Sequence, residues 1–320
     1  MDILEVKQLV DKIRENVRTV IIGRDEVINH MLAAILCEGH VLLEDVPGSG
    51  KTMLAKTLAK SIDGEFKRIQ MTPDLMPTDI TGINYFNMKT SQFEFIKGPA
   101  FSNVLIADEI NRATPKTQAG LLECMEERQV TIDGVTHNLN RPFIVIATQN
   151  PVDTQGVFPL PEAQIDRFIM KLPMEYPSHQ DSMRLLHIHM QENRLEQVRP
   201  VVSLTEVVEA IDTVNKVTIH EDLIEYVVNI IEATRNDPNI ILGVSSRGGL
   251  ALLKASRAVA AMNGRTYVKP DDIKQSAVSV CAHRLVLRNS LQIKKDGDKE
   301  LIEDILEKIP VPTEEQLYHE

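Results

Sequence analysis

Short continuous apolar runs alternate with helical spacing in the first half of the chain. Runs at 41–43, 104–107 and 143–147 are typical of parallel strands that are buried on both faces. Apolar residues recur every three or four positions over 4–17 and 24–38, as they do in amphipathic helices. Strands that alternate with helices in this way predict an α/β core built on a parallel sheet with flanking helices.

Two pairs of short strands interrupt this alternation. Residues 83–87 and 93–96 flank a turn and predict a β-hairpin inserted between core elements, although an ordinary pair of sheet strands fits the same pattern. Residues 130–136 carry Asp133-Gly134, which is a strong turn signal, and predict a second hairpin. The core is therefore expected to carry inserted β-hairpins.

Strand-like alternation ends after a predicted strand at 169–172. Ser203 and Thr218 each begin a capping box, and a helix is predicted to begin at Ser246, so the rest of the chain is expected to be all-α. We predict a core at 1–173, a linker at 174–178, a helical second domain at 179–290 and a charged C-terminal tail at 291–320, with a short helix at 301–309.

Composition is that of an ordinary globular protein and excludes several classes. The 320 residues suggest about two domains. A net charge of −11 argues against a broad nucleic-acid-binding face, while leaving room for a local basic groove. The three cysteines lie far apart, the N-terminus is too charged for a signal peptide, and no apolar run reaches the ~18 residues of a membrane span. We therefore expect a cytoplasmic protein with reduced thiols and no membrane insertion.

A candidate phosphate-binding loop lies between the first strand and the helix after it. Gly48 and Gly50 allow backbone N–H groups to curl around a polyphosphate, and the helix that follows points its positive end at that anion. Lys51 can reach the β- and γ-phosphates, and the Thr52 hydroxyl can bind Mg²⁺. The P-loop consensus has glycine where this chain has Asp45, and a chance turn before a helix is the alternative.

A second motif favours the P-loop. Asp108 ends a buried strand, where it can hold Mg²⁺ directly or through water, and Glu109 beside it can orient and polarise a water for attack on the γ-phosphate. Asn150 ends another buried strand and can touch the γ-phosphate or that water, or serve as a turn residue before Pro151. Arg112 is either a structural ion-pair partner or a residue that acts across a subunit interface.

These motifs predict a nucleoside triphosphate and Mg²⁺ as cofactors. We expect ATP, because Thr218 stands where the guanine-reading N-K-x-D motif has aspartate. The metal ligands are expected to be Thr52 and Asp108. The residues expected to bind the nucleotide are Ile22, Gly23, Asp45, Pro47, Gly48, Ser49, Gly50, Lys51, Thr52 and Met53.

The order of these motifs resembles the AAA+ ATPases. The segments 42–52, 105–134, 146–151 and 158–168 resemble the MoxR family in particular, in which an acidic residue often replaces the first P-loop glycine. The resemblance spans roughly residues 20–284. It implies a P-loop AAA+ core followed by a helical lid, with the two hairpins as the helix-2 insert and the pre-sensor-1 hairpin. Besides Glu109, it implies three catalytic residues with separate roles: Asn150 as sensor 1, Arg167 as the arginine finger and Arg247 as the sensor 2 arginine.

The resemblance also implies a function. MoxR proteins form hexameric rings and are thought to act as chaperone-like remodellers, often of partner proteins with a von Willebrand factor A domain. Two alternatives remain open: an AAA+ motor or loader on nucleic acid, and the ATPase subunit of a metal-chelatase-like complex. The negative net charge and the low aromatic content of 4% weigh against a surface that stacks single-stranded bases.

Overall fold

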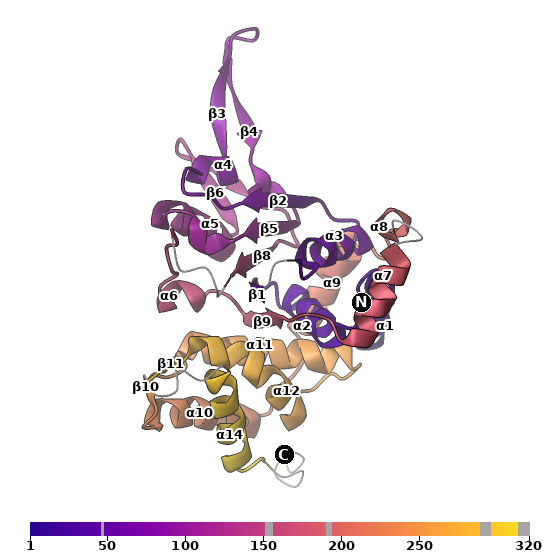
Figure 1. Ribbon diagram of the computed structural model, residues 1–320, viewed down its shortest axis with the longest axis vertical. Helices are drawn as coiled ribbons and strands as arrows, with labels where there is room; N and C mark the ends of the chain where they lie inside the picture. Colours follow the sequence, from indigo (N-terminus) through magenta and orange to yellow (C-terminus); the bar gives the residue numbers. More distant parts are fainter. Residues whose placement is uncertain (46–47, 151–155, 190–193, 289–295, 313–320) are drawn as a thin grey trace.

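A five-stranded parallel sheet lies at the centre of the molecule (Figure 1). The structure is a computed structural model that describes residues 1–45, 48–150, 156–189, 194–288 and 296–312. The strand order is β2–β5–β8–β1–β9, with the bounds β1 Val41–Asp45, β2 Phe66–Gln70, β5 Val104–Asp108, β8 Ile144–Gln149 and β9 Met170–Met174. All four neighbouring pairs are parallel, so the carboxyl ends of the strands meet at one edge.

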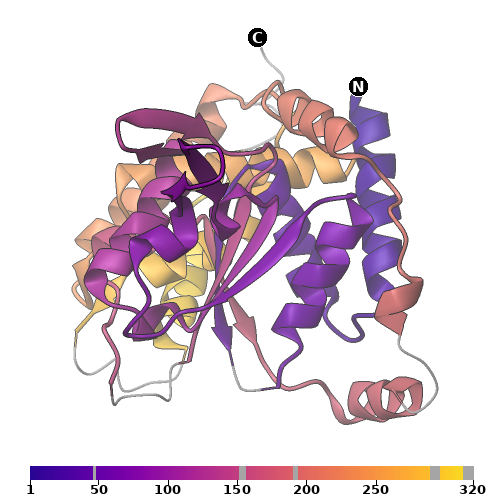
Figure 2. The ribbon, with the colours of Figure 1, turned by 90° about the horizontal axis from the view of Figure 1, so that it is seen from above.

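Alternate side chains of the central strands enter two separate apolar cores, which explains the continuous apolar runs. Leu43 and Ile106 belong to the core shared with helices α1 (Ile3–Arg18), α2 (Asp25–Leu36) and α3 (Lys51–Ser61). Leu42 and Leu105 belong to the core shared with α5 (Pro115–Glu127). Helices accordingly cover both faces of the sheet (Figure 2).

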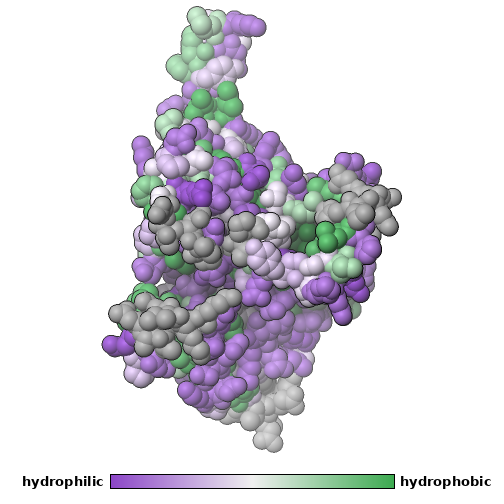
Figure 3. Space-filling view, viewed as in Figure 1, coloured by the Kyte–Doolittle hydropathy of each residue, from purple (hydrophilic) through white to green (hydrophobic). Residues whose placement is uncertain are grey.

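Both predicted hairpins are present, each as a two-stranded antiparallel sheet separate from the central one. They are β3 (Gly82–Asn87) with β4 (Gln92–Lys97), and β6 (Gln129–Ile132) with β7 (Val135–Asn138). The first follows the short helix α4 (Pro77–Thr81) and projects from the body of the molecule (Figure 1). Its outer part exposes apolar side chains (Figure 3), with Phe86 50%, Met88 86% and Phe93 73% exposed. It is therefore an insertion and not an ordinary pair of sheet strands.

The second half of the chain is mainly helical, as predicted. Its helices are α7 His179–His189, α8 Arg194–Gln197, α9 Leu204–Val214, α10 Glu221–Asn236, α11 Ser246–Met262, α12 Pro270–Cys281 and α14 Gly297–Lys308. The prediction missed a small antiparallel pair, β10 (Ile240–Leu242) with β11 (Val286–Leu287), because strands this short show no alternation. The helix predicted at 301–309 corresponds to α14, whose apolar face is buried against the preceding helices.

The predicted linker begins inside the sheet. Met174, the first residue of the predicted linker, is the last residue of β9. Among the described residues β9 pairs with β1 alone, so it is an edge strand, where a proline such as Pro173 is tolerated. Just beyond β9, Arg24 donates from Nη2 to the Glu175 carbonyl at 2.6 Å. The chain then crosses back, and α9 packs against α1 and α2. The domain boundary at 174–178 stays a prediction.

The cysteines have the environment expected of reduced thiols. Cys124 and Cys281 are buried, and burial raises the pKa of each thiol to about 12. None of the helices in the described parts of the chain is both long and apolar enough to span a membrane.

Candidate functional site

The loop after β1 leads into a helix whose N-cap is a glycine. Helix α3 begins at Lys51, and its N-cap Gly50 has a left-handed φ of 90° with no side-chain capping hydrogen bond. Gly48 also has a positive φ of 80°, and a Cβ at either glycine would meet nothing within 4 Å. The backbone conformation, and not a lack of space, therefore requires glycine here. The first N–H groups of α3 and its positive end are suited to an anion.

Lys51 and Asp108, which belong to different motifs, are in direct contact. Their Nζ and Oδ1 atoms lie 2.6 Å apart, and the Asp108 side chain is only 3% exposed. Thr148 on β8 donates to Oδ1 at 2.8 Å, and Arg68 on β2 donates to Oδ2 at 2.7 Å. Burial raises the pKa of the Asp108 carboxyl, but the hydrogen bonds from Lys51, Thr148 and Arg68 outweigh it, so the net pKa lies below its ordinary value. Asp108 is therefore a buried carboxylate at physiological pH.

Glu109 is held in an unusual backbone conformation next to this carboxylate. Its φ of 56° is left-handed, which is uncommon for a residue other than glycine and is often found at functional sites. Its N–H donates to Thr148 Oγ1 at 2.8 Å, and its Oε2 accepts from Gln70 Nε2 at 2.8 Å. Arg112 Nε lies 3.3 Å from the same oxygen. Arg112 therefore forms an ion pair with Glu109 within the chain, and its action across a subunit interface stays a prediction.

The remaining predicted P-loop and sensor residues lie along the same edge. Asp45 is the last residue of β1, and Asn150 directly follows β8 and is half-buried. Ser49 is buried, whereas Thr52 and Met53 are half-buried in the first turn of α3. Pro47 lies outside the described residues.

Ile22 and Gly23 lie beside the segment that leaves the sheet. Gly23 has a φ of 71°, and a Cβ there would come within 2.3 Å of the Asp181 carboxylate on α7. Arg24, the next residue, holds the Glu175 carbonyl. These two predicted nucleotide contacts are therefore placed where the core meets the entrance to the helical half.

The two predicted arginines both contact α5. The half-buried Arg167, which follows the short helix α6 (Glu162–Ile165), donates from Nη1 to the Leu122 carbonyl at 3.1 Å. Arg247, in the first turn of α11, forms an ion pair with Glu126, and these side chains are 44% and 39% exposed. The sequence could not show where the side chains of these two predicted residues lie, and their catalytic roles stay predictions.

Sequence analysis missed three residues of this site: Arg68, Gln70 and Thr148. Arg68 and Gln70 come from β2, and they reach the acidic residues because β2 lies next to β5 in the sheet. Thr148 precedes Asn150 by two positions on β8, so the strand-end pattern that identified Asn150 was its one available signal.

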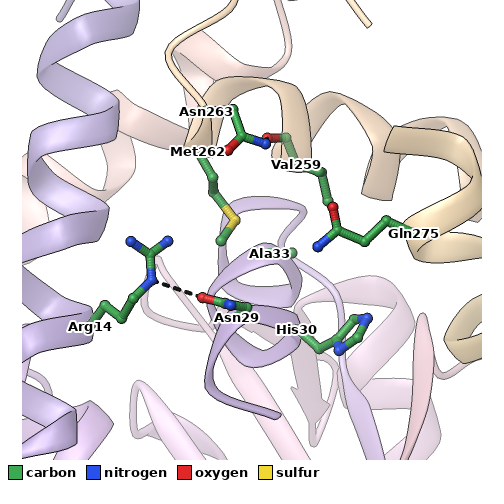
Figure 4. A pocket seen from close by; sticks show the side chains of 8 residues that line it. All are labelled: Arg14, Asn29, His30, Ala33, Val259, Met262, Asn263 and Gln275. Carbon is green, nitrogen blue, oxygen red and sulfur yellow. Dashed lines mark hydrogen bonds between the residues drawn. The ribbon is translucent and has the colours of Figure 1, made fainter. Parts of the chain in front are cut away.

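A cavity of about 90 Å³ lies elsewhere, between α1, α2 and the helices α11 and α12 (Figure 4). Its lining includes Arg14, Asn29 and Met262, and none of the motif residues. The helix N-terminus, Lys51, Asp108 and Glu109 remain the arrangement suited to binding and hydrolysing a polyphosphate.

Comparison with known proteins agrees with this arrangement. The family model described as "ATPase family associated with various cellular activities (AAA)" matches residues 40–170, and the model of the AAA lid domain matches 232–309. YeaC of Bacillus subtilis, an uncharacterised protein, is 44% identical, with 97% of each chain covered. Chaperone MoxR1 of Mycobacterium tuberculosis is 38% identical, covering 92% of this chain and 80% of the relative.

A solved structure is similar throughout. It is a crystal structure of a protein from Cytophaga hutchinsonii that was proposed to be an ATPase. The TM-score is 0.90 at 39% identity, and 97% of each chain is covered.

We predict that Lys51→Ala weakens ATP binding without unfolding the protein. The substitution removes a charge-assisted phosphate contact worth about 1.5–3 kcal/mol. Asp108 keeps Arg68 and Thr148 as partners, so no buried charge is left alone. Titration with a fluorescent ATP analogue measures the affinity, and Lys60→Ala in the last turn of the same helix is the matched control. Equal affinities in the two variants would contradict the P-loop assignment.

Proposed function

The chain belongs to the MoxR family of AAA ATPases, and we propose that it hydrolyses ATP with Mg²⁺ in a hexameric ring that remodels partner proteins. The observation that carries the proposal is the contact between Lys51 and Asp108, which joins the glycine loop to the acidic strand end. In this proposal the phosphates lie at the N-terminus of α3, with Lys51 as their cationic contact.

The donor set fits a magnesium ion. The Asp108 carboxylate and the Thr52 hydroxyl are oxygen donors of the kind that Mg²⁺ prefers, and the positive N-terminal end of α3 suits the phosphates that would share the ion. Thr52 and Asp108 would hold the metal, which when bound neutralises charge on the phosphate oxygens. Asp45, Ser49, Met53, Ile22 and Gly23 complete the proposed nucleotide contacts.

Glu109 is the proposed general base. Its hydrogen bond from Gln70 and its ion pair with Arg112 hold the carboxylate in one orientation. The carboxylate is 27% exposed, so water can reach it. Asn150, at the end of the neighbouring strand β8, is proposed to hold the γ-phosphate or the attacking water.

Two arginines that lie outside the glycine loop, Arg247 and Arg167, are proposed to contact the phosphates of ATP during hydrolysis. Arg247 contacts the γ-phosphate from the lid of the same subunit. Arg167, next to the sheet's edge strand β9, serves the ATP of the neighbouring subunit, since its own site already has Lys51 and Arg247. A heterologous ring interface can provide such an arginine to every site.

The proposed partners are proteins, with von Willebrand factor A-domain proteins as the first candidates, and the proposed compartment is the cytoplasm. The relative named Chaperone MoxR1 supports protein remodelling. An acidic chain with a net charge of −11 gives little support to a nucleic-acid motor.

We predict that DNA and RNA leave the ATPase rate unchanged at physiological salt. A phosphate backbone needs several cationic contacts, which this composition does not favour. A phosphate-release assay with single-stranded and double-stranded polymers measures the effect, with heparin as a polyanion control. Stimulation by DNA or RNA that heparin does not reproduce would favour the motor instead.

We predict that Glu126→Gln strengthens ATP binding. The substitution releases Arg247 from an exposed ion pair worth about 0.2–1 kcal/mol, which corresponds to an affinity gain of up to about fivefold. Equilibrium titration with ATP in the presence of EDTA measures this gain in the absence of hydrolysis. Glu123→Gln, at an exposed position on the same helix, controls for the loss of negative charge. Weaker binding by Glu126→Gln than by this control would argue against a γ-phosphate contact for Arg247.

We predict that mixing two inactive variants restores activity. Glu109→Gln binds ATP but lacks the base, and Arg167→Ala loses a transition-state arginine worth roughly 10³–10⁵ in rate. A ring that contains both chains has some interfaces with an intact Glu109 from one chain and an intact Arg167 from the other, so partial turnover should return. Mixtures that exchange subunits, as measured by fluorescence energy transfer, yet stay inactive would exclude action across the interface.

A further inference from the structure

The backbone on both sides of Arg167 is held by a buried arginine from the helical half of the chain. Arg284 lies at the end of η3 (Ala282–Arg284), and its side chain is only 3% exposed. Its Nε donates to Asp166 Oδ1 at 2.6 Å, and its Nη2 donates to the Phe168 carbonyl at 2.7 Å. Longer hydrogen bonds reach the Asp166 carbonyl at 3.1 Å and the Ile169 carbonyl at 3.3 Å. One guanidinium therefore fixes the segment 166–169.

The first turn of α11 belongs to the same unit. Ser245, the N-cap of α11, donates to the second carboxylate oxygen of Asp166 at 2.9 Å. A Cβ on Gly248 would lie 2.8 Å from Arg284 Cδ, so this turn lies directly against the arginine stem. The start of α11, which carries Arg247, is thus joined to Asp166 both directly and through Arg284.

Arg167 itself points elsewhere, because its guanidinium donates to the Leu122 carbonyl on α5. The contacts from η3 and α11 therefore act on its backbone and leave its side chain to reach another target. Burial and several hydrogen bonds restrict the four torsions of the Arg284 side chain, so a displacement at one end can be transmitted to the segment at the other end.

We propose that Arg284 is a positioning residue that couples the lid to Arg167, so that the lid of one subunit sets the arginine offered to the next. The sequence of contacts runs from Arg247 through Ser245 and Arg284 to Asp166 and then to Arg167. The proposal rests on the proposed function, because it requires Arg167 to serve the neighbouring ATP.

The first test compares binding with turnover in Arg284→Gln. If Arg284→Gln displaces Arg167, ATP affinity should stay unchanged while turnover falls about 10²-fold. This is the loss expected when a group at a reacting centre is displaced by about 1 Å. The matched control is Arg265→Gln, which also removes an arginine ion pair of the helical half, with Asp272, but does not touch 166–169. The control should keep normal turnover. Equal losses in both variants would overturn the positioning role.

The decisive test mixes Arg284→Gln with Glu109→Gln. If Arg284 acts through Arg167 on the next subunit, interfaces that combine Glu109 from the first chain with Arg284 and Arg167 from the second regain activity. At equal amounts these are about one quarter of the interfaces in a randomly mixed ring. If Arg284 acts only within its own subunit, the mixture stays inactive. That result, together with recovery in the Arg167→Ala mixture, overturns this inference alone, whereas failure of both mixtures overturns the proposed function.

A second variant covers the case in which Arg284→Gln does not fold. Asp166→Asn keeps the shape and an acceptor oxygen but loses the charge, and its carboxylate position is 20% exposed. Thermal unfolding and oligomer size are measured first for both variants. Asp166→Asn should show a smaller loss of turnover that the Glu109→Gln chain also rescues. Unfolding of both variants would overturn the proposal, because the contact would then be required for the fold itself.

Discussion

The buried carboxylate of Asp108 is the interaction on which the site depends. A buried charge is stable only when it is paired and hydrogen-bonded, and this one is paired with Lys51 and Arg68 and accepts a hydrogen bond from Thr148. These three partners come from α3, β2 and β8, so the carboxylate fixes the glycine loop relative to the neighbouring strands β2, β5 and β8. The same arrangement also positions Glu109, because its backbone N–H donates a hydrogen bond to Thr148 Oγ1.

The parts of this arrangement that were predictable from sequence are local. The glycine loop with Lys51, and the apolar strand that ends in Asp108, are contiguous patterns whose chemistry follows from residue type and spacing. Arg68 and Gln70 were not predictable in this way, because their contacts depend on β2 lying beside β5. Arg284 was further out of reach, since 118 residues separate it from Asp166. Whether the first hairpin is an insertion or a pair of sheet strands was not predictable for a similar reason. Its strands count as an insertion because they pair with each other and not with the central sheet, and the sequence does not show which strands pair.

The packing of the helical half restricts how it can move. Its buried residues and those of α1 and α2 form one continuous apolar core, and Arg24 holds the chain at Glu175 where it leaves the sheet. Elements joined over such a surface move by small sliding displacements more readily than by free rotation about a linker. The cavity of about 90 Å³ between α1, α2, α11 and α12 lies at this contact (Figure 4). When the helical half moves only slightly, a tightly bonded connection such as that from Arg284 to 166–169 is needed to pass the movement on to Arg167.

Helix α5 connects the two arginines proposed to act on different ATP molecules. Arg167 contacts the Leu122 carbonyl and Arg247 pairs with Glu126, and these positions are four residues apart on the helix. Residues at this spacing lie one turn apart on one side of a helix. The same helix packs against the sheet through Leu121 and follows the segment that carries Asp108 and Glu109. Arg247, proposed to act on the subunit's own nucleotide, and Arg167, proposed to act on the neighbour's, therefore both contact the same helix. A small shift of α5 against the sheet would change both contacts together, which is a physical basis for coupling successive sites in the proposed ring.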